Sequence, residues 1–378
     1  MKFRRKIPCS IIRGGTSKGI YFLERDLPEE GDERDRFLLK VMGSPDPKQV
    51  DGLGGGTSVT SKAAIIRPST REDADVDYTF AQISVDKPLV SYKGNCGNIS
   101  SGVGPFAIEK GLVAAKEPVT EVRIYNTNTD KVIVAEVRTE QGQVLYEGEA
   151  RIAGVPGTAS PIKLKFMNPS GTISRGLLPT GNRTDILQIP GLGPLEVSIV
   201  DAANPLVFVR AEDLGLSGTE LPGELDQDQK KLELLETVRG MAAVKLGLIQ
   251  DHLTSPWSCP GIPKMTFVTG PESYRTSNGT LIEADQVDLT GRMMSMQKTH
   301  PTYAMTGAMC TAAAAAVPGT IVAKAIRQGT DLSYIRIGHP GGILEAGVDC
   351  EPGDKEPMIN YTSGIRTANL LMEGYFFY

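Results

Sequence analysis

Short segments of alternating or β-branched residues, each bounded by turn-forming residues, recur along the chain. Such segments are typical of β-strands that bury one face. The sequence predicts strands at 79–85, 119–125, 131–137, 143–148 and 195–200. Residues 126–130, with sequence NTNTD, lie between two of these segments. They predict a hairpin, because Asn and Asp tolerate turn geometry.

Helical periodicity is rarer. Apolar residues recur every three or four positions through 226–249 and predict an amphipathic helix whose apolar stripe packs in the core. An alanine-rich segment that begins at Thr306 predicts a second helix, ended by VPG at 317–319. Residues 106–111 predict a short third helix. The chain is therefore expected to be mostly sheet with a few helices, an α+β protein.

The sequence contains signs of an internal duplication. Residues 13–28 align with 200–215 at an offset of 187 positions. TSKAAII aligns with IPKMTFV at an offset of 202, which places Lys62 opposite Lys264. CGNISSGVG aligns with AMTGAMCTA at an offset of 208, which places Cys96 opposite Ala304. Offsets that rise in chain order are what a duplication with small insertions produces.

The duplication predicts two similar domains, 1–184 and 185–378, divided within the Gly- and Pro-rich stretch 179–194. The C-terminal segment could also pack back onto the first domain. Two similar domains facing each other are expected to bind a ligand in the cleft between them.

Composition narrows the class of protein. The 378 residues carry 40 Lys and Arg against 45 Asp and Glu, a net charge of −5, which argues against nucleic acid or an anionic membrane as partner. Five cysteines without a C-x-x-C pair argue against a zinc ribbon or a disulfide scaffold and fit a reducing cytoplasm. The longest uncharged stretch, 299–323, is mostly Ala with Gly and Pro, and predicts a buried helix, not a membrane span.

The first candidate site is the sequence RGGTSKG at 13–19. The backbone amides of this glycine-rich stretch, together with the side chains of Thr16, Ser17 and Lys18, could hold a carboxylate or phosphate. The spacing is not that of a Walker A loop. An ordinary Gly-rich turn is an equally good interpretation.

The second candidate is Lys62, which follows the Gly-rich stretch 51–57 and precedes an apolar run. A lysine at the mouth of a buried strand is a candidate base, because partial burial disfavours the charged ammonium. A solvent-exposed lysine at a strand edge is the commoner alternative.

The third candidate is Cys96 in the sequence GNCGN, ahead of a helix. Unpaired amides and the positive end of the helix dipole favour a thiolate there. The alternative is a small apolar residue in a turn. The neighbouring Gly97 and Asn98 resemble an anion-binding nest and favour the functional interpretation.

The fourth candidate is the segment from His300 to Ala308, which opens the alanine-rich helix with Thr306 as its cap and Gly307 in its first turn. Two helix starts facing one cleft would suit a dicarboxylate. No H-E-x-x-H, no cluster of His, Asp and Glu, and no G-x-G-x-x-G in a strand–helix unit is present. We therefore expect neither a metal nor a nucleotide cofactor.

The motifs GGTSKG, TSKAAII, GNCGNISSGVGPFAI, YNTNT, VDAANPLVFV, KTHPTYAMTGA and RTANLLMEGY occur in this order across almost the whole chain. In them the chain resembles the methylitaconate and methylaconitate isomerases, the PrpF-like family, which are relatives of diaminopimelate epimerase. The resemblance implies two similar, pseudo-symmetric domains, each a curved, barrel-like sheet around a central helix. It also implies that Lys62 and Cys96 lie at the reacting carbon, with Ser17 and Lys18 nearby and the TGA helix start binding substrate.

The implied activity is a cofactor-independent 1,3-proton shift in a small unsaturated dicarboxylate, with 3-methylitaconate and 2,3-dimethylmaleate as the first expected pair. Cis–trans isomerisation of 2-methylaconitate and tautomerisation of 4-oxalomesaconate are alternatives. A cysteine hydrolase that uses Cys96 with His300, or a silent carboxylate-binding protein, would belong to another class. Diaminopimelate epimerases use two facing cysteines, and here the second position falls on Ala304. The only expected partner is the small-molecule substrate. The sequence does not decide whether the chain forms a homo-oligomer.

Overall fold

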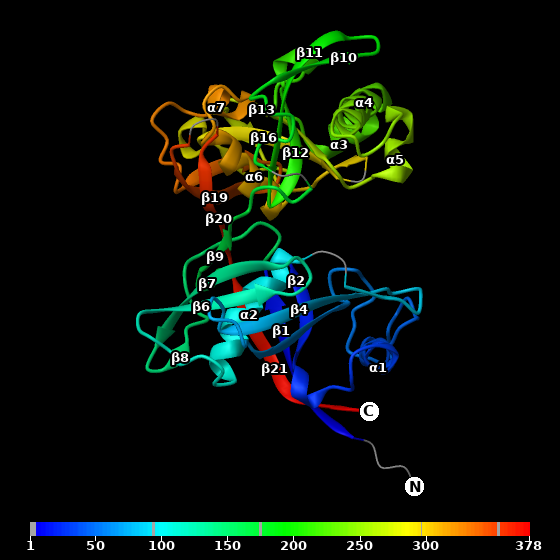
Figure 1. Ribbon diagram of the computed structural model, residues 1–378, viewed down its shortest axis with the longest axis vertical. Coiled ribbons are helices and arrows are strands. Elements are labelled where there is room, and N and C mark those ends of the chain that lie inside the picture. Colours follow the sequence, from blue (N-terminus) through cyan, green and yellow to red (C-terminus); the bar gives the residue numbers. More distant parts are fainter. Residues whose placement is uncertain (1–4, 93–94, 174–175, 296, 354–355) are drawn as a thin grey trace. The chain divides into compact units, whose positions relative to one another are not determined.

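Backbone contacts divide the chain into two units (Figure 1). The structure is a computed structural model and describes residues 5–92, 95–173, 176–295, 297–353 and 356–378. The first unit comprises Met1–Met167 with Ile365–Tyr378, and the second comprises Asn168–Gly364. Both combine strands with a small number of helices, so the fold class is α+β.

The boundary between the units falls at 167/168, ahead of the predicted 184/185. The segment that follows residue 167 belongs to the second unit because it is hydrogen-bonded to a strand of that unit. Gly171 donates its amide to the carbonyl of Asp201 at 2.9 Å, and the Asp201 amide donates to Leu177 O at 2.9 Å. The C-terminal segment belongs to the first unit because its strand pairs with the first strand of the chain, with Cys9 opposite Gly374.

In the first unit, one continuous run of paired strands has the order β21–β1–β2–β3–β4–β6–β7–β9. Its strands are β1 (Lys6–Gly14), β2 (Ser17–Leu23), β3 (Lys62–Pro68), β4 (Val76–Ile83), β5 (Val90–Ser91), β6 (Val119–Asn126), β7 (Lys131–Glu140), β8 (Gln143–Val144), β9 (Ile162–Met167) and β21 (Ala368–Phe377). Its helices are η1 (Glu24–Asp26), α1 (Asp32–Met42) and α2 (Gly97–Glu109). Helix α2 contacts eight of these strands, so the sheet curves around it (Figure 1).

In the second unit, the paired strands have the order β10–β11–β12–β13–β16–β18–β19–β20. Its strands are β10 (Asp185–Ile189), β11 (Gly193–Ala202), β12 (Asn204–Arg210), β13 (Lys264–Thr269), β14 (Tyr274–Arg275), β15 (Leu281–Ile282), β16 (Leu289–Ser295), β17 (Lys298–Thr299), β18 (Ile335–His339), β19 (Gly342–Glu351) and β20 (Met358–Arg366). The last two residues of β20, Ile365 and Arg366, belong to the first unit. Its helices are α3 (Pro222–Gln227), α4 (Gln229–Lys245), α5 (Ser255–Ser258), α6 (Met305–Ala315) and α7 (Ile321–Ala325), with 3-10 turns η2 (Glu212–Leu214), η3 (His252–Thr254) and η4 (Ala284–Gln286). The buried helix α6 packs against β11, β12 and β19.

The two units share one sequence of strand pairings: antiparallel, parallel, antiparallel, parallel, antiparallel, antiparallel. In the first parallel pairing of each unit, Gly19 lies opposite Lys62 and Leu206 lies opposite Lys264. The alignment of the two halves of the sequence pairs the same residues, Gly19 with Leu206 and Lys62 with Lys264. A short strand then precedes the central helix in each unit, β5 before α2 and β17 before α6.

Two helices differ from their predicted extents. The helix expected at 226–249 is two helices, because Asp228 has non-helical backbone angles and caps α4 by accepting the Lys231 amide. Helix α2 begins at Gly97, nine residues before the predicted start at 106. Its glycines weaken helix propensity, but a Cβ on Gly102 would lie 2.3 Å from the Tyr21 hydroxyl oxygen. The glycines are therefore needed for close packing around the helix.

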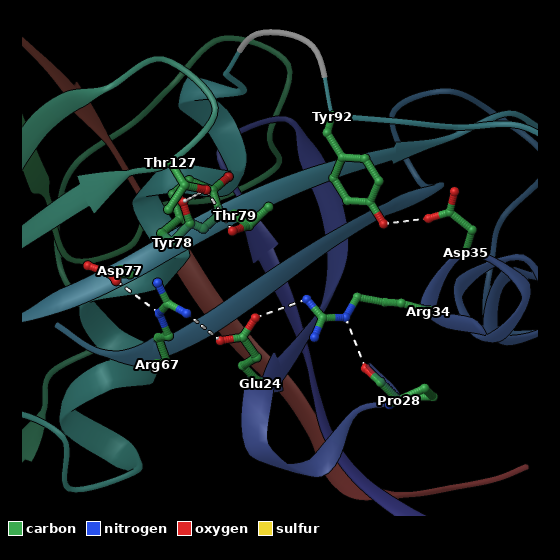
Figure 2. Close-up of polar contacts among 10 residues, drawn as sticks. All are labelled: Glu24, Pro28, Arg34, Asp35, Arg67, Asp77, Tyr78, Thr79, Tyr92 and Thr127. Carbon is green, nitrogen blue, oxygen red and sulfur yellow. Dashed lines mark hydrogen bonds and ion pairs between the residues drawn. The ribbon is translucent and has the colours of Figure 1, made fainter. Parts of the chain in front are cut away.

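A chain of ion pairs ties η1, α1, β3 and β4 together in the first unit (Figure 2). Glu24 accepts from Arg34 Nη1 at 2.9 Å and from Arg67 Nη1 at 3.1 Å. Arg67 Nε donates to Asp77 Oδ2 at 2.9 Å. Because these charges satisfy one another, we assign the cluster a structural role.

Candidate functional site

The starts of β2 and β3 present their side chains to helix α2. Lys62 opens β3 directly opposite Gly19 of β2, and paired residues on neighbouring strands share a face. A Cβ on Gly19 would lie 2.9 Å from Ile99 Cδ1, so this face meets α2. Ser17 lies two residues before Gly19 and therefore shares the face. The structure thus brings Lys62 and Ser17 to one side of α2.

The Lys62 side chain is buried and bonded to a neutral group. It is 8% exposed, and its Nζ donates to Gln82 Oε1 at 2.5 Å. The Nζ also lies 5.2 Å from the centre of the Phe80 ring. Gln82 is held in turn by donating Nε2 to the carbonyl oxygen of Ser61 at 3.0 Å. Among the described residues, no carboxylate forms an ion pair with Lys62.

The Gly-rich stretch before Lys62 supports the strand start. Buried Gln49 accepts the Gly56 amide at 2.8 Å and the Ser61 hydroxyl at 2.9 Å through Oε1. A Cβ on Gly54 would lie 2.1 Å from that same oxygen, so the loop closes tightly over Gln49. Sequence reasoning missed Gln49 and Gln82 because an amide in a strand or loop carries no periodic signal.

Cys96 is the N-cap of α2, in extended backbone (φ −117°, ψ 98°) and without a side-chain capping bond. The first helical hydrogen bond runs from the Ser100 amide to Cys96 O at 2.9 Å. The amides of Gly97, Asn98 and Ile99 therefore have no partner within the helix. Cys96 stands at the positive end of the helix dipole, where an anion is stabilised. Gly94, the first residue of the GNCGN motif, lies outside the described residues.

Asn98 links the start of α2 to the turn between β1 and β2. Its Nδ2 donates to Thr16 Oγ1 at 2.9 Å and to Ser17 Oγ at 3.4 Å. A Cβ on Gly15 would lie 2.2 Å from Asn98 Oδ1, and Gly15 also has a φ of +53°. The backbone conformation therefore favours glycine at this turn, and the neighbouring amide leaves no room for a Cβ.

Arg366, which sequence reasoning did not single out, joins the same cluster. Its side chain is 9% exposed, and its Nε donates to Asn98 Oδ1 at 3.2 Å. Burial lowers the pKa of its guanidinium to about 10, and the nearby Cys96 sulfur opposes this shift. Only its place in the motif RTANLLMEGY could have drawn attention to it.

Lys18 does not join the cluster. Strand alternation turns its side chain away from the face that carries Ser17 and Gly19, and its amide donates to Val59 O at 2.9 Å. The prediction that Lys18 binds beside Ser17 is not supported by this geometry.

In the second unit, His300 follows β17 and accepts the Thr302 amide at 3.1 Å through Nδ1. In the neutral ring, the proton is therefore on Nε2. Burial lowers the pKa of His300, and Lys264 nearby lowers it further. The pKa of Lys264 is lowered by burial and then by Arg239. His300 thus lies near the cation Lys264, and Lys264 lies near Arg239, which is itself paired with Glu236.

The start of α6 differs from the prediction. Its N-cap is Ala304, not Thr306, which lies in the first turn. The Ala308 amide already donates to Ala304 O at 2.9 Å, and the Ala308 side chain is fully buried in the core. Ala308 therefore offers no free polar group to a ligand. The amides of Thr306 and Gly307 precede that first helical hydrogen bond.

Cys310 lies inside α6 and is fully buried, with its Sγ 3.4 Å from Val200 O. Burial raises the pKa of its thiol well above the ordinary value. Cys310 therefore packs in the core.

Within the described residues, no group of three His, Cys, Asp or Glu side chains could hold a metal ion. A search of the same residues found no helix with the length and apolar character needed to cross a membrane.

The PrpF protein family matches residues 4–378. The chain belongs to the PrpF family. It is 46% identical over 376 residues to the 3-methylitaconate isomerase of Eubacterium barkeri, covering 99% of this chain and 98% of the relative. It is 41% identical to the 2-methyl-aconitate isomerase of Shewanella oneidensis (98% and 96% covered) and 41% identical to the 4-oxalomesaconate tautomerase of Pseudomonas putida (98% and 95% covered).

Solved structures agree with this assignment. A methylitaconate-delta-isomerase superimposes with a TM-score of 0.93 at 45% identity, covering all of this chain and 96% of the other. A hydroxyproline epimerase from Agrobacterium vitis, 13% identical with a TM-score of 0.54, shows the shared fold alone. This PrpF-family chain is an isomerase with an epimerase-like fold.

The PrpF-family chain also departs from a symmetric two-thiol arrangement. Cys96 caps α2 in the first unit, whereas the corresponding helix cap in the second unit is Ala304. An alanine supplies no proton, so any acid–base chemistry at this position falls to the first unit.

Proposed function

We propose that this isomerase catalyses a cofactor-independent 1,3-proton shift that interconverts 3-methylitaconate and 2,3-dimethylmaleate. The relative at 46% identity is named for 3-methylitaconate. The observation that carries the chemistry is buried Lys62, whose Nζ is bonded to an amide oxygen and to no carboxylate among the described residues.

Lys62 is the base in this proposal. A carboxylate partner would hold the ammonium in its charged form, whereas the amide of Gln82 orients the nitrogen and adds no charge. The neutral amine takes a proton from the carbon next to a carboxylate, and the electron pair of that C–H bond enters the allylic system.

The negative charge that develops on the substrate carboxylate requires fixed donors. The free amides at the start of α2 provide them, together with the hydroxyls of Thr16 and Ser17, which Asn98 holds in place. The double bond shifts when a proton is added at the far carbon, so that the composition of the substrate is unchanged. Either Lys62 returns the proton it removed or Cys96 delivers a different one.

In the second unit, the groups suited to a carboxylate are His300, through Nε2, and the first-turn amides of α6 at Thr306 and Gly307. We propose these three residues as the carboxylate-binding groups of the second unit. Ala308 is left out because its amide is already bonded within the helix.

Proton NMR of the purified protein in D₂O tests the proposal. With 3-methylitaconate or 2,3-dimethylmaleate, we expect deuterium at the methyl or methine positions and approach to one equilibrium mixture from either side. Retention of part of the substrate's own hydrogen in the first product would assign both transfers to one group, Lys62. If only 2-methylaconitate or 4-oxalomesaconate is turned over, that compound replaces 3-methylitaconate as the proposed substrate. No deuterium exchange with any of the four compounds would overturn the proposal.

A further inference from the structure

Arg366 is a buried cation at the start of α2 that has no acidic partner among the described residues. Nη1 donates to the carbonyl of the preceding residue, Ile365, at 2.8 Å, and Nε donates to Asn98 Oδ1 at 3.2 Å. Nη2 donates to no described residue. Guanidinium groups in protein interiors are ordinarily paired with carboxylates, because an unpaired buried charge is destabilising.

The position of Arg366 is fixed from both sides. The next residue, Thr367, accepts the Gly15 amide at 2.8 Å and Arg13 Nη1 at 3.1 Å through its carbonyl oxygen. Asn98 holds the guanidinium from the other side. These contacts position the guanidinium, and none of the described residues supplies it with a counter-charge.

The start of α2 supplies further donors at the same place. Cys96 does not cap the helix through its side chain, so the amides of Gly97, Asn98 and Ile99 lack partners within the helix. The guanidinium and the Cys96 sulfur are close enough to interact electrostatically. A buried cation and an uncapped helix start together form an anion site of the kind that planar carboxylates fill.

We infer that Arg366 binds a carboxylate of the substrate through Nη2, beside the uncapped amides of α2. That the carboxylate is the substrate's rests on the proposed function. The guanidinium would bind the carboxylate in the ground state and the transition state alike, so its loss should act on KM more than on kcat.

The test compares Arg366→Met, Arg366→Lys and the control Arg36→Met, which removes an exposed arginine of the same unit. A hydrogen bond to a charged group contributes about 1.5–3 kcal/mol, which corresponds to about 10- to 150-fold. We expect Arg366→Met to raise KM by that factor with kcat within about threefold of the parent. Arg366→Lys should raise KM less, and Arg36→Met should change neither constant.

Malonate binding, followed by calorimetry and by the rise in melting temperature, gives a readout independent of turnover. We expect Arg366→Met to lose most of the malonate effect. Without ligand, its melting temperature should stay the same or rise, because an unpaired buried charge has been removed. Should Arg366→Met fail to fold, the Arg366→Lys protein decides the question by the same two measurements.

A structural role through Asn98 gives a different pattern. If Arg366 served only to orient Asn98, Asn98→Ala would reproduce the change in KM and the double variant would add nothing to it. That result, or unchanged KM and malonate binding in Arg366→Met, overturns the inference while the isomerase activity stands. If the parent protein binds malonate through Arg366 but isomerises none of the candidates, the anion site stands and the proposed function fails.

Discussion

The first residues of β3 and β13 occupy the same position in the two units but have different surroundings. Lys62 and Lys264 each open a strand and lie opposite the equivalent residue of the parallel neighbour. The β3–β4 pairing extends to Lys62 itself and places Gln82 opposite it. In the second unit, the described pairing of β13 with β16 begins only at Thr266, so it gives Lys264 no partner of the kind that Gln82 is for Lys62.

The starts of α2 and α6 differ in the same sense. Cys96 caps the first helix and Ala304 caps the second. The first unit thus combines an amine on an amide acceptor with a thiol, whereas the second presents Lys264 and His300 without a thiol at the helix cap. The two units share one strand order but give their lysines different neighbours, so we expect proton transfer to depend on Lys62 and not on Lys264.

The largest expected effect separates the two lysines. Lys62→Met removes the proposed base and should lower kcat at least 100-fold, within the range of 10²–10⁴ for a positioned general base. Lys264→Met should leave kcat within about threefold of the parent, and we expect any loss to appear in KM. Initial rates by NMR over a range of substrate concentrations measure both constants. Equal losses of kcat would show that the two lysines share the chemistry and that the comparison is wrong.

The second effect tests what Gln82 contributes. Gln82→Leu removes the acceptor that orients Lys62 Nζ and should lower kcat about tenfold with little change in KM. Gln82→Glu keeps an acceptor but adds a charge that favours the ammonium, so its kcat–pH profile should move to higher pH. Gln188→Leu, at an exposed position on β10, is the control. An unshifted pH profile in Gln82→Glu would reduce Gln82 to a structural role.

The sequence predicted those parts of the site that rest on local pattern. Alignment of the two halves placed Lys62 opposite Lys264 and Cys96 opposite Ala304, and the structure gives these pairs equivalent positions in their units. The alternation of β6 and β7 and the hairpin between them were also predicted. These features depend on residues close together in the chain, so spacing carries the information.

Long-range contacts were not predictable. Arg366 reaches Asn98 across 268 positions, and Gln82 reaches Lys62 from a neighbouring strand, with no periodicity to indicate either. Helix α2 was predicted too short because its glycines have low helix propensity, and tertiary packing overrides that preference. Lys18 was assigned to the site by its neighbours in sequence, although strand alternation turns it away.

A third, smaller effect compares turns. Gly15 has a φ of +53°, and the corresponding hairpin of the second unit carries Ala203 at +58°, so the backbone conformation alone tolerates alanine. At Gly15, a Cβ would also collide with Asn98. Gly15→Ala should therefore lower stability by more than the roughly 1–2 kcal/mol of left-handed strain, and raise KM. Gly111→Ala, at φ +67° with nothing within 4 Å, measures the strain alone.

Thermal unfolding of Gly15→Ala and Gly111→Ala isolates the contact with Asn98. A strain of that size corresponds to a fall of about 2–8 °C for units of this length. We expect the larger fall, and the only change in KM, in Gly15→Ala. Equal falls in melting temperature with unchanged KM would mean that Asn98 moves aside freely. The contact between the turn and α2 would then not contribute to substrate binding.

The smallest expected effect is the titration of His300, which reports the cationic surroundings of Lys264. Burial, and then Lys264, lower the pKa of His300 below its ordinary value of 6.5. Lys264→Met removes only the second cause, so the pKa of His300 should rise but remain below 6.5. Lys298→Met, which removes an exposed lysine two residues away, should leave it unchanged.

The ring-proton NMR signals of the three histidines report these values directly, with His300→Gln to assign the resonance. The same shift predicts a pH dependence of stability. Because the folded-state pKa of His300 is depressed, its contribution is present above the unfolded value near 6.5 and is lost as pH falls through the folded value. Lys264→Met should narrow the pH range over which this contribution to stability is lost. If the pKa of His300 does not move in Lys264→Met, the two side chains do not interact, and the second unit has no cationic counterpart to the lysine–amide pair of the first.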